Sequence, residues 1–432
     1  MNTEKIKAGF AQEIITPSSA EVFMDGYGFR TSPAEGVHDE LYVKVCAITQ
    51  GNARFTLVSL DICGFSEDIA NIVMGHIAAV SGISAHEIAL CATHTHASFV
   101  CGLLGDLPLN YMLWHRIGIL AGQAVKRAFD DACEGRFAVN IGEELRSIGN
   151  RRNPDGLCDR RVKVMGFYDN SDILRGVIVS ASCHPVIKTD MLLSADYPGI
   201  LTRDAARQYP GTPFLFLQGR CADINPSVPN AAGLTEACEH LGGELRDSVF
   251  GALNSMDINA HSKVLLESRY AKIKVPMVDY PDTATLEESV RIFREKLYAA
   301  QSPYERRVFL RYMLWHDNAF KQVTAGIKSN FITVPIQVMT LSGTAAFVFI
   351  PFELFTRTGN TLEAILTGMG YSPSSVMIIG YANGTYGYLA PRDELAQGGY
   401  EMIEAAYWYG LPQCGEESED AVIAGIKDKL GV

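Results

Sequence analysis

Short apolar runs rich in β-branched residues recur along the whole chain, separated by polar segments with glycine and proline. Runs of this kind are typical of strands that are buried on at least one face. They predict strands at 41–48, 55–60, 87–92, 176–182, 214–217, 331–341, 345–350 and 376–379.

Between several of these runs, apolar residues recur at the spacing of one helix face. This periodicity predicts helices at 66–80, 111–133, 199–208 and 234–253, with a short amphipathic helix at 416–432. Strand and helix largely alternate through the first 255 residues. We therefore predict an α/β fold with a mixed β-sheet core flanked by helices.

The segment 283–322 has a different pattern, because it is strongly helical and rich in charged residues of both signs. The Ser302-Pro303 step interrupts it, so we predict a helical hairpin inserted into the fold. Three interpretations remain open: a solvated insertion, a lid over a substrate site, and a contact between copies of the chain in a homo-oligomer.

The composition favours a large buried core. The chain has 432 residues, of which 47% are hydrophobic and only 20% are charged. Length alone would allow two or three domains, but large α/β enzymes often form one continuous unit. We therefore expect residues 1–432 to form a single catalytic domain.

The charge pattern narrows the range of partners. The net charge is −12, and the basic residues are scattered instead of forming a stripe that could follow a phosphate backbone. We therefore expect a small-molecule substrate and no nucleic acid. Residues 1–7 are polar and no run is long and apolar enough for a transmembrane helix, so a cytoplasmic location is expected.

The ten cysteines indicate neither disulfides nor a thiolate metal site. Most of them lie inside apolar segments, where a free thiol behaves as a small hydrophobic group, and no CxxC pair occurs.

The strongest local signal for chemistry is the sequence Thr93-His94-Thr95-His96, which follows the predicted strand 87–92. Residues two positions apart on extended chain face the same way, and α/β enzymes place their sites at strand ends. The pair therefore indicates metal binding, although structural histidines with satisfied hydrogen bonds would explain it as well.

Two further strand ends carry candidate ligands. His184 ends the strand 176–182 just before Pro185, and Glu353 follows the strand 345–350 at the start of an expected helix. His184 could be a core histidine, and Glu353 could simply favour the helix N-terminus. Two histidines and a carboxylate are nevertheless a recurrent ligand set for catalytic zinc, which keeps one position open for water or substrate.

Two more loops after strands contain polar groups. The loop 380–388 is rich in glycine and tyrosine, and the loop 218–226 contains Asp223 and Asn225. A surface turn would explain the first loop, and Asx-turn chemistry would explain the second without catalysis. Asp196 is either a cap of the helix beginning near Pro198 or a partner of a metal-bound imidazole.

Taken in order along nearly the whole chain, several motifs resemble those of the neutral, non-lysosomal ceramidase family. They are Gly9 with Ile15-Thr16-Pro17, then Gly26-Tyr27-Gly28, Gly36-Val37-His38-Asp39, the strand and aspartate at 57–61, and Thr93-His94-Thr95-His96.

The resemblance implies one Zn²⁺ per chain, held by His94, His184, Glu353 and Tyr388. It further implies that His96, Arg151 and Tyr400 surround the reacting carbonyl.

The chain departs from the family at one catalytic position. The family carries a serine in a Gly-Asp-x-Ser-Pro-Asn segment, and Asn225 replaces it here. The chain is also shorter than full ceramidases, so we expect no C-terminal immunoglobulin-like domain. The resemblance then implies a zinc-dependent hydrolase of an amide, ester or lactone that uses water as nucleophile and does not act on ceramide. In that mechanism Asn225 would orient the substrate and Asp223 would steer a neighbouring donor.

Two rival functions stay open. One is another metal-dependent enzyme on the same scaffold, such as a lactonase, a sugar-ester hydrolase or an isomerase of a small polar carbonyl compound. The other is a non-catalytic metal-containing binding protein that lost turnover with the serine.

Overall fold

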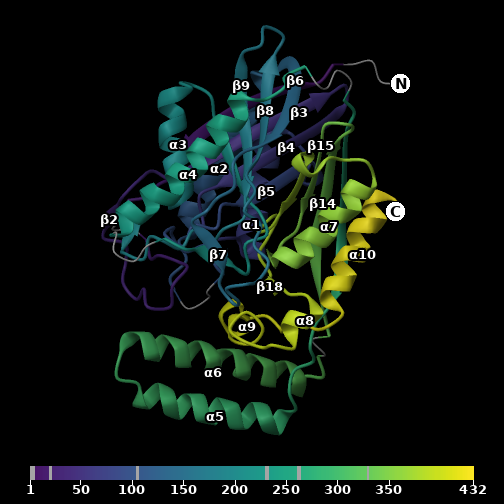
Figure 1. Ribbon diagram of the computed structural model, residues 1–432. Helices are drawn as coiled ribbons and strands as arrows, with labels where there is room; N and C mark the ends of the chain where they lie inside the picture. The colour runs from purple at the N-terminus through teal and green to yellow at the C-terminus, as the bar shows by residue number, and fades with distance from the viewer. Residues whose placement is uncertain (1–4, 19–21, 104–106, 229–232, 260–263, 328–329) are drawn as a thin grey trace.

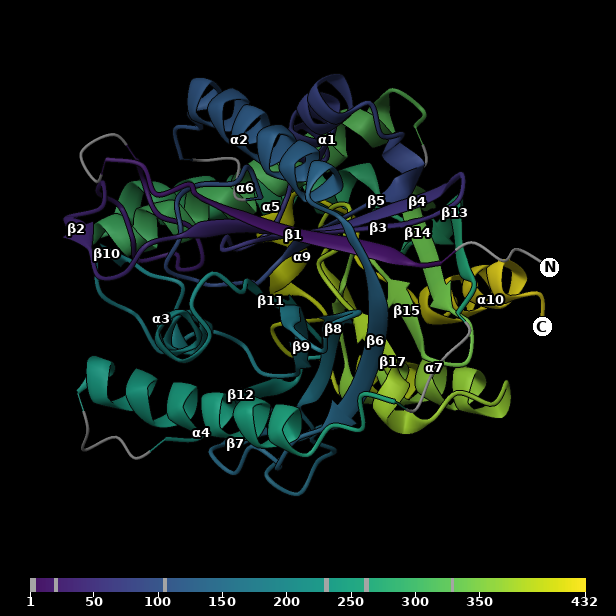
Figure 2. The same ribbon diagram turned by 90° about the horizontal axis from the view of Figure 1, so that it is seen from above.

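Two β-sheets pack face to face, and helices cover the outer face of each (Figures 1 and 2). The computed structural model describes residues 5–18, 22–103, 107–228, 233–259, 264–327 and 330–432. The first four residues of the polar N-terminal segment lie outside these ranges.

The larger sheet has eight strands in the order β11-β9-β8-β6-β1-β3-β4-β5. Most neighbouring strands are antiparallel, whereas β4 with β5 and β9 with β11 form parallel pairs at the two edges. The strands are β1 (Lys7–Ile14), β3 (Tyr42–Gln50), β4 (Ala53–Leu60), β5 (Ile88–Ala92), β6 (Cys133–Ile141), β8 (Lys163–Asp169), β9 (Leu174–Ala181) and β11 (Phe214–Gln218).

The smaller sheet has four strands: β13 (Leu266–Pro276), β14 (Phe331–Leu341), β15 (Ala345–Phe349) and β17 (Val376–Ile379). Its inner face packs against the larger sheet through one continuous apolar cluster. Leu57, Phe137 and Ile178 of the larger sheet belong to this cluster together with Met339 and Phe347 of the smaller one. This shared core fixes the two sheets relative to one another.

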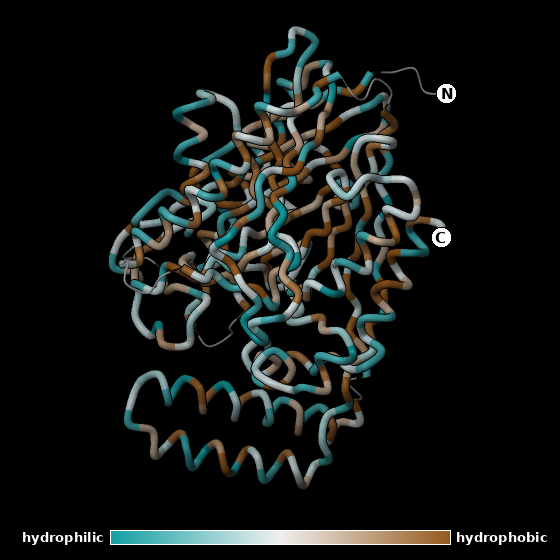
Figure 3. The backbone as a smooth tube through the Cα atoms, viewed as in Figure 1, coloured by the Kyte–Doolittle hydropathy of each residue, from teal (hydrophilic) through white to brown (hydrophobic). Residues whose placement is uncertain are grey.

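Six helices cover the outer faces. The larger sheet carries α1 (Glu67–Ser81), α2 (Tyr111–Asp130), α3 (Tyr197–Gln208) and α4 (Leu234–Asn254). The smaller sheet carries α7 (Thr356–Gly368) and α10 (Ser418–Leu430). In Figure 3 the strands between these layers are largely brown, as expected for buried apolar chain.

Short elements join the layers near the ends of the strands. They are β2 (Gly36–Val37) with β10 (Leu192–Leu193), β7 (Ile148–Asn150) with β12 (Ile224–Pro226), β16 (Glu353–Leu354) with β18 (Tyr388–Leu389), the helices α8 (Arg392–Leu395) and α9 (Glu404–Tyr409), and 3₁₀ turns at Ala85–Glu87 and Pro373–Ser375.

The predicted α/β fold with a mixed sheet is confirmed, and each predicted strand and helix is present. One boundary was wrong, because α2 ends at Asp130 and Cys133 already begins β6. The apolar residues after the helix continue its periodicity, so spacing alone could not separate the two elements. Of the strands in the two large sheets, β1, β6, β8 and β13 were missed.

The predicted helical hairpin is confirmed as α5 (Thr283–Ala299) and α6 (Pro303–Thr324). Ser302 caps the start of α6, since its hydroxyl accepts from the amide of Glu305 and the Glu305 carboxylate accepts from the amide of Ser302. The hairpin lies at the end of the molecule where α9 is located, with α6 on the inner side (Figure 1). None of the helices in the described ranges is both long and apolar enough to cross a membrane.

Candidate functional site

Strand ends that are far apart in the sequence meet between the two sheets. His94 follows β5, His184 follows β9, and Glu353 begins β16 just after β15. The short parallel pair of β16 and β18 sets Tyr388 directly beside Glu353. The structure therefore brings all four residues of the expected zinc set into one region.

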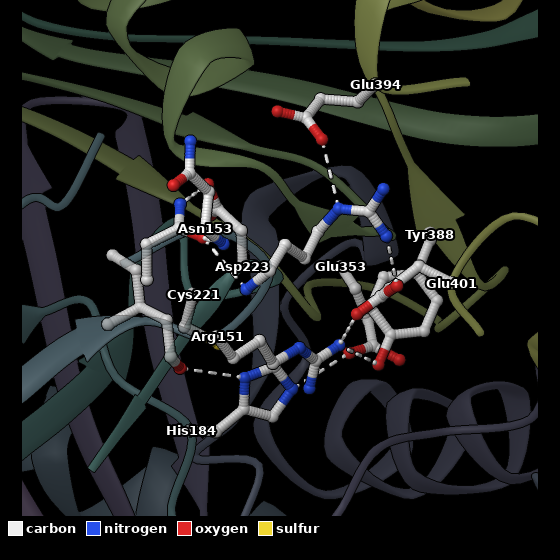
Figure 4. Close-up of polar contacts among 12 residues, drawn as sticks. Arg151, Asn153, His184, Cys221, Asp223, Glu353, Tyr388, Glu394 and Glu401 are labelled. Carbon is white, nitrogen blue, oxygen red and sulfur yellow. Dashed lines mark hydrogen bonds and ion pairs between the residues drawn. The ribbon is translucent and has the colours of Figure 1, made fainter. Parts of the chain in front are cut away.

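Three of these residues point donor atoms at one spot. Nε2 of His184 lies 3.2 Å from Oε2 of Glu353, and Nε2 of His94 lies 3.6 Å from the same oxygen. All three side chains are buried, and their ligand atoms lie within 4.8 Å of one another. Figure 4 shows His184 and Glu353 directed toward each other.

Backbone carbonyls fix the orientation of both imidazoles. Nδ1 of His94 donates to the carbonyl of Cys63 at 2.6 Å, and Nδ1 of His184 donates to the carbonyl of Ile224 at 3.1 Å. Because a carbonyl oxygen only accepts, each Nδ1 carries the proton and each neutral ring presents the Nε2 lone pair. Two lone pairs and a carboxylate oxygen thus face one another, an arrangement that requires a cation or a proton between them. Two imidazoles and a carboxylate fit Zn²⁺.

Two tyrosines hold the Glu353 carboxylate. The hydroxyl of Tyr381 donates to Oε2 at 3.0 Å, and the hydroxyl of Tyr409 donates to Oε1. Partners of this kind orient a metal ligand and tune its basicity. The sequence reasoning missed Tyr409, because nothing in its local sequence separates it from the other tyrosines near it.

Replacing Tyr409 by phenylalanine is therefore expected to weaken zinc binding by about 10- to 100-fold while the fold is kept. Zinc affinity measured by competition with a chelator checks this result. Tyr407→Phe is the matched control, since Tyr407 lies on the same helix but packs against α6. Equal zinc affinities of the two variants would contradict a positioning role for Tyr409.

Burial and neighbouring charges shift the pKa values of His94, His184 and Glu353. Burial lowers the pKa of His94 to about 3, although Glu353 opposes the shift. Burial would also lower the pKa of His184, but interactions with Cys221 and Glu353 outweigh it and raise that pKa to about 9. Burial would raise the pKa of Glu353, but the two histidines hold it below its usual value. Of the two imidazoles, His184 is thus the more basic, and it would be the one to hold a proton against the carboxylate in the absence of a metal.

The backbone at the site is strained. His94 and Tyr381 are two of the five non-glycine residues with positive φ in the described chain, at 67° and 51°. Their rings stack, with centroids 4.0 Å apart and planes at 22°. Such conformations typically cost about 1–3 kcal/mol and cluster at functional sites.

Arg151 lies behind Tyr388. Its Nη2 donates to the Tyr388 hydroxyl at 3.1 Å and lies 2.8 Å from a carboxylate oxygen of Glu401 (Figure 4). Glu401 also binds Arg152, which in turn binds Glu394 at 3.0 Å. The nearby carboxylates and Tyr388 outweigh burial and raise the pKa of Arg151, so its positive charge is permanent.

His96 faces the same space as His94. The two Nε2 atoms are 3.1 Å apart, and the ring of His96 meets Tyr27 edge-on at 5.2 Å. The other ring nitrogen of His96, Nδ1, is buried and has no hydrogen-bond partner among the described residues.

The loop residues Asp223 and Asn225 do not line the pocket described below. The carboxylate of Asp223 accepts from the amide and hydroxyl of Thr356 at 2.9 and 2.8 Å, which anchors the start of α7. Asn225 lies in β12, and within the described ranges its Oδ1 has no hydrogen-bond partner. Asp196 caps α3 through the amide of Tyr197.

A pocket of about 230 Å³ opens onto the candidate metal ligands. Of the predicted site residues, His94, His96, Glu353, Tyr388 and Tyr400 line it. The remaining wall was not predicted as part of the site, and half of its residues are aromatic. It consists of Asp25, Gly26, Tyr27, Gly28, Phe29, Cys63, Leu103, Tyr304, Trp408 and Tyr409.

No protein-family model and no curated protein matches this chain in sequence. Solved structures do match in fold. Neutral ceramidase from Pseudomonas aeruginosa superimposes with a TM-score of 0.76 at 18% identity, covering 99% of this chain and 74% of the ceramidase. A ceramidase complexed with C2 gives a TM-score of 0.74 at 18% identity, covering 99% and 75%. The expected resemblance is confirmed at the level of the fold: the chain has a neutral ceramidase-like fold.

Proposed function

We propose that this chain is a zinc-dependent hydrolase that cleaves an amide, ester or lactone bond in a small molecule. The observation that carries the proposal is the pair of imidazoles whose Nδ1 protons are given to backbone carbonyls, so that both Nε2 lone pairs face Glu353. His94, His184 and Glu353 would hold one zinc ion, with Tyr388 as the fourth ligand.

Zinc in such a site polarises a carbonyl and lowers the pKa of water toward about 7. The residues of the chain would supply the rest of the chemistry. Asn225 has no hydroxyl, so water takes the place of a serine nucleophile. His96 and Tyr400, which line the pocket, would donate to the developing oxyanion, a role that contributes about 3 kcal/mol per donor.

Arg151 would act through Tyr388 in this mechanism. Its permanent positive charge lies against the phenolic oxygen, and Glu401 keeps the guanidinium there. Asn225 and Asp223 would then support the loop near the site; Asp223 does so through Thr356.

Metal analysis followed by a substrate panel tests the proposal. We expect about one zinc per chain in purified protein and turnover of at least one class among N-acyl, ester and lactone substrates, with loss of turnover after chelation and recovery on adding zinc. Metal-free protein that also rejects added zinc would overturn the proposal.

The absence of a hydroxyl at Asn225 also fits functions that need no nucleophilic serine. A lactonase or sugar-ester hydrolase would show selective turnover within the same panel. A metal-dependent isomerase would convert a small polar carbonyl compound without cleaving it. A binding protein would hold zinc and ligand without turnover.

A further inference from the structure

The helical hairpin reaches the pocket. Tyr304, in the first turn of α6, lines the cavity beside residues that belong to the two-sheet body. One turn later Arg307 donates to the carbonyls of Tyr27 and Arg30 at 3.0 and 2.8 Å. These hydrogen bonds hold the hairpin against the segment around Tyr27, which forms the opposite wall of the pocket.

The hairpin also holds α9 in place. Arg311 of α6 donates to the carbonyls of Tyr407 and Trp408, and the Arg307 guanidinium lies 5.6 Å from the centroid of the Trp408 ring. Trp408 therefore has a fixed position in the pocket wall. These contacts favour the interpretation of 283–322 as a cover of the site over that of a solvated insertion.

Gly28 lies close against the opposite wall. A Cβ added there would lie 2.9 Å from Cη2 of Trp408 and 3.1 Å from Cε2 of Tyr304. On the same segment, the rings of Tyr27 and Phe29 stack at 4.9 Å with planes at 18°. The pocket thus lies between one aromatic pair on the body and another on α6 and α9.

The aromatic rings also form the mouth of the pocket. Phe29 and Tyr304 are about half exposed, at 48% and 49%, whereas His94 and Glu353 at the base are almost fully buried. A substrate would pass these rings before its carbonyl reached the candidate metal ligands.

The charge of the lining restricts the substrate. Among the described residues that line the pocket, the ionisable acids are Asp25 and Glu353, and no lysine or arginine is present. Two arginines lie nearby but do not line the pocket. Arg151 donates to the hydroxyl of Tyr388, and Arg307 donates to backbone carbonyls. Apart from the zinc ion proposed at the base of the pocket, a carboxylate or phosphate on the substrate ring would meet no cationic side chain among the described lining residues to replace its lost hydration.

We propose that this aromatic enclosure selects an uncharged substrate with a single ring next to the scissile carbonyl, and that Tyr304 and Trp408 determine this specificity. The inference rests on the proposed function, because it assigns the substrate class of the same pocket. The volume of about 230 Å³ lies below the usual range of pockets for drug-sized ligands, which favours a compact substrate. Either an aryl ring or the apolar face of a sugar or lactone ring has the required chemistry.

Binding measured by calorimetry on the full-length, zinc-loaded chain tests the inference. The probes are acetamide, benzamide and 4-phenylbenzamide, with methyl glucoside as the sugar-ring arm. We expect one of the single-ring probes to bind about tenfold more tightly than acetamide, and 4-phenylbenzamide to bind more weakly than benzamide. Whichever single-ring probe binds better identifies the type of ring.

Tyr304→Ala is expected to reduce the preference for a ring over acetamide by about tenfold and to admit the two-ring probe. Tyr298→Ala is the control, since Tyr298 is on the same hairpin but is 79% exposed and does not line the pocket. Gly28→Ala narrows the same wall without strain from a positive φ, and is expected to weaken binding of the single-ring probe. Together these two variants separate a change in pocket shape from a loss of folding.

The ring specificity and the hydrolase assignment can be overturned independently of one another. Unchanged ring preference in both Tyr304→Ala and Gly28→Ala would overturn the inference, even if the protein hydrolyses an amide, ester or lactone. Ring-selective binding that depends on Tyr304, without turnover of any substrate in the panel, would support the inference and overturn the hydrolase assignment.

Discussion

Replacing His184 by alanine is expected to abolish stoichiometric zinc binding and to lower kcat/KM by about 10³-fold, which corresponds to a loss of about 4 kcal/mol of transition-state stabilisation. The effect is large because His184 is buried and its Nε2 is the closest nitrogen to the Glu353 carboxylate. The carbonyl of Ile224 orients the ring, so the substitution removes a nitrogen ligand that is already directed at the site.

Elemental analysis and kinetics on three variants check this expectation. His94→Ala should behave like His184→Ala, because both rings present Nε2 to the same carboxylate oxygen. His86→Ala serves as the control, since His86 is exposed in the 3₁₀ turn before β5 and is not part of the pocket. If both His94→Ala and His184→Ala retained one zinc per chain, the metal assignment would be wrong.

The sequence located the core of the site because that core lies at the ends of apolar strands. His94, His184 and Glu353 each follow a run whose hydrophobic pattern is unambiguous, and the strands that these runs form end where the two sheets meet. Their backbone partners were not predictable, because the carbonyls of Cys63 and Ile224 come from a bend after β4 and from the short strand β12, whose positions depend on the folded sheets.

The pocket wall was not predictable for a related reason. Tyr304, Trp408 and Gly28 come together only after the hairpin has docked on α9 and on the segment near Tyr27. No local pattern encodes that contact. The ring of Tyr409 likewise becomes recognisable only when the folded chain has placed it beside Glu353.

The missed strands show a similar limit. β13 carries alternating charged residues and is exposed along much of its length, so its hydrophobic signal is weak. β8 is buried throughout but contains glycine, lysine and aspartate, and its lysine is compensated by Glu363 on a distant helix. Contacts with other parts of the folded chain thus determine that both segments form strands, and these contacts cannot be inferred from the sequence of either segment alone.

A buried cluster of charges joins the helix α7 to the larger sheet. Glu363 of α7 pairs with Arg161 at 2.5 Å, with Lys163 of β8 at 2.8 Å and with Arg220 after β11. Asp159 completes the cluster by pairing with Arg161 and Arg220 at 2.6 and 2.7 Å. Because α7 packs on the smaller sheet, these ion pairs cross from one sheet to the elements of the other.

Glu363→Gln is expected to lower the free energy of unfolding by about 3–5 kcal/mol at pH 7, since it leaves three cations around a neutral group in a buried position. The midpoint of guanidinium-induced unfolding measures the loss. Burial alone would raise the pKa of Glu363, but Arg220, Arg161 and Lys163 outweigh it and lower that pKa from 4.5 to about 2. Its contribution to stability is therefore present in full above about pH 5 and is lost as the pH falls toward 2.

The pH dependence separates this ion cluster from a simple loss of packing. Wild type should lose stability between about pH 5 and pH 2 more steeply than Glu363→Gln, because the variant has no carboxylate to protonate there. Glu288→Gln is the control, since Glu288 pairs with Arg291 on the exposed surface of α5 and its loss should leave the midpoint nearly unchanged. An equally steep acid loss in wild type and Glu363→Gln would mean that other carboxylates govern acid unfolding and that the cluster contributes little to holding α7 on the larger sheet.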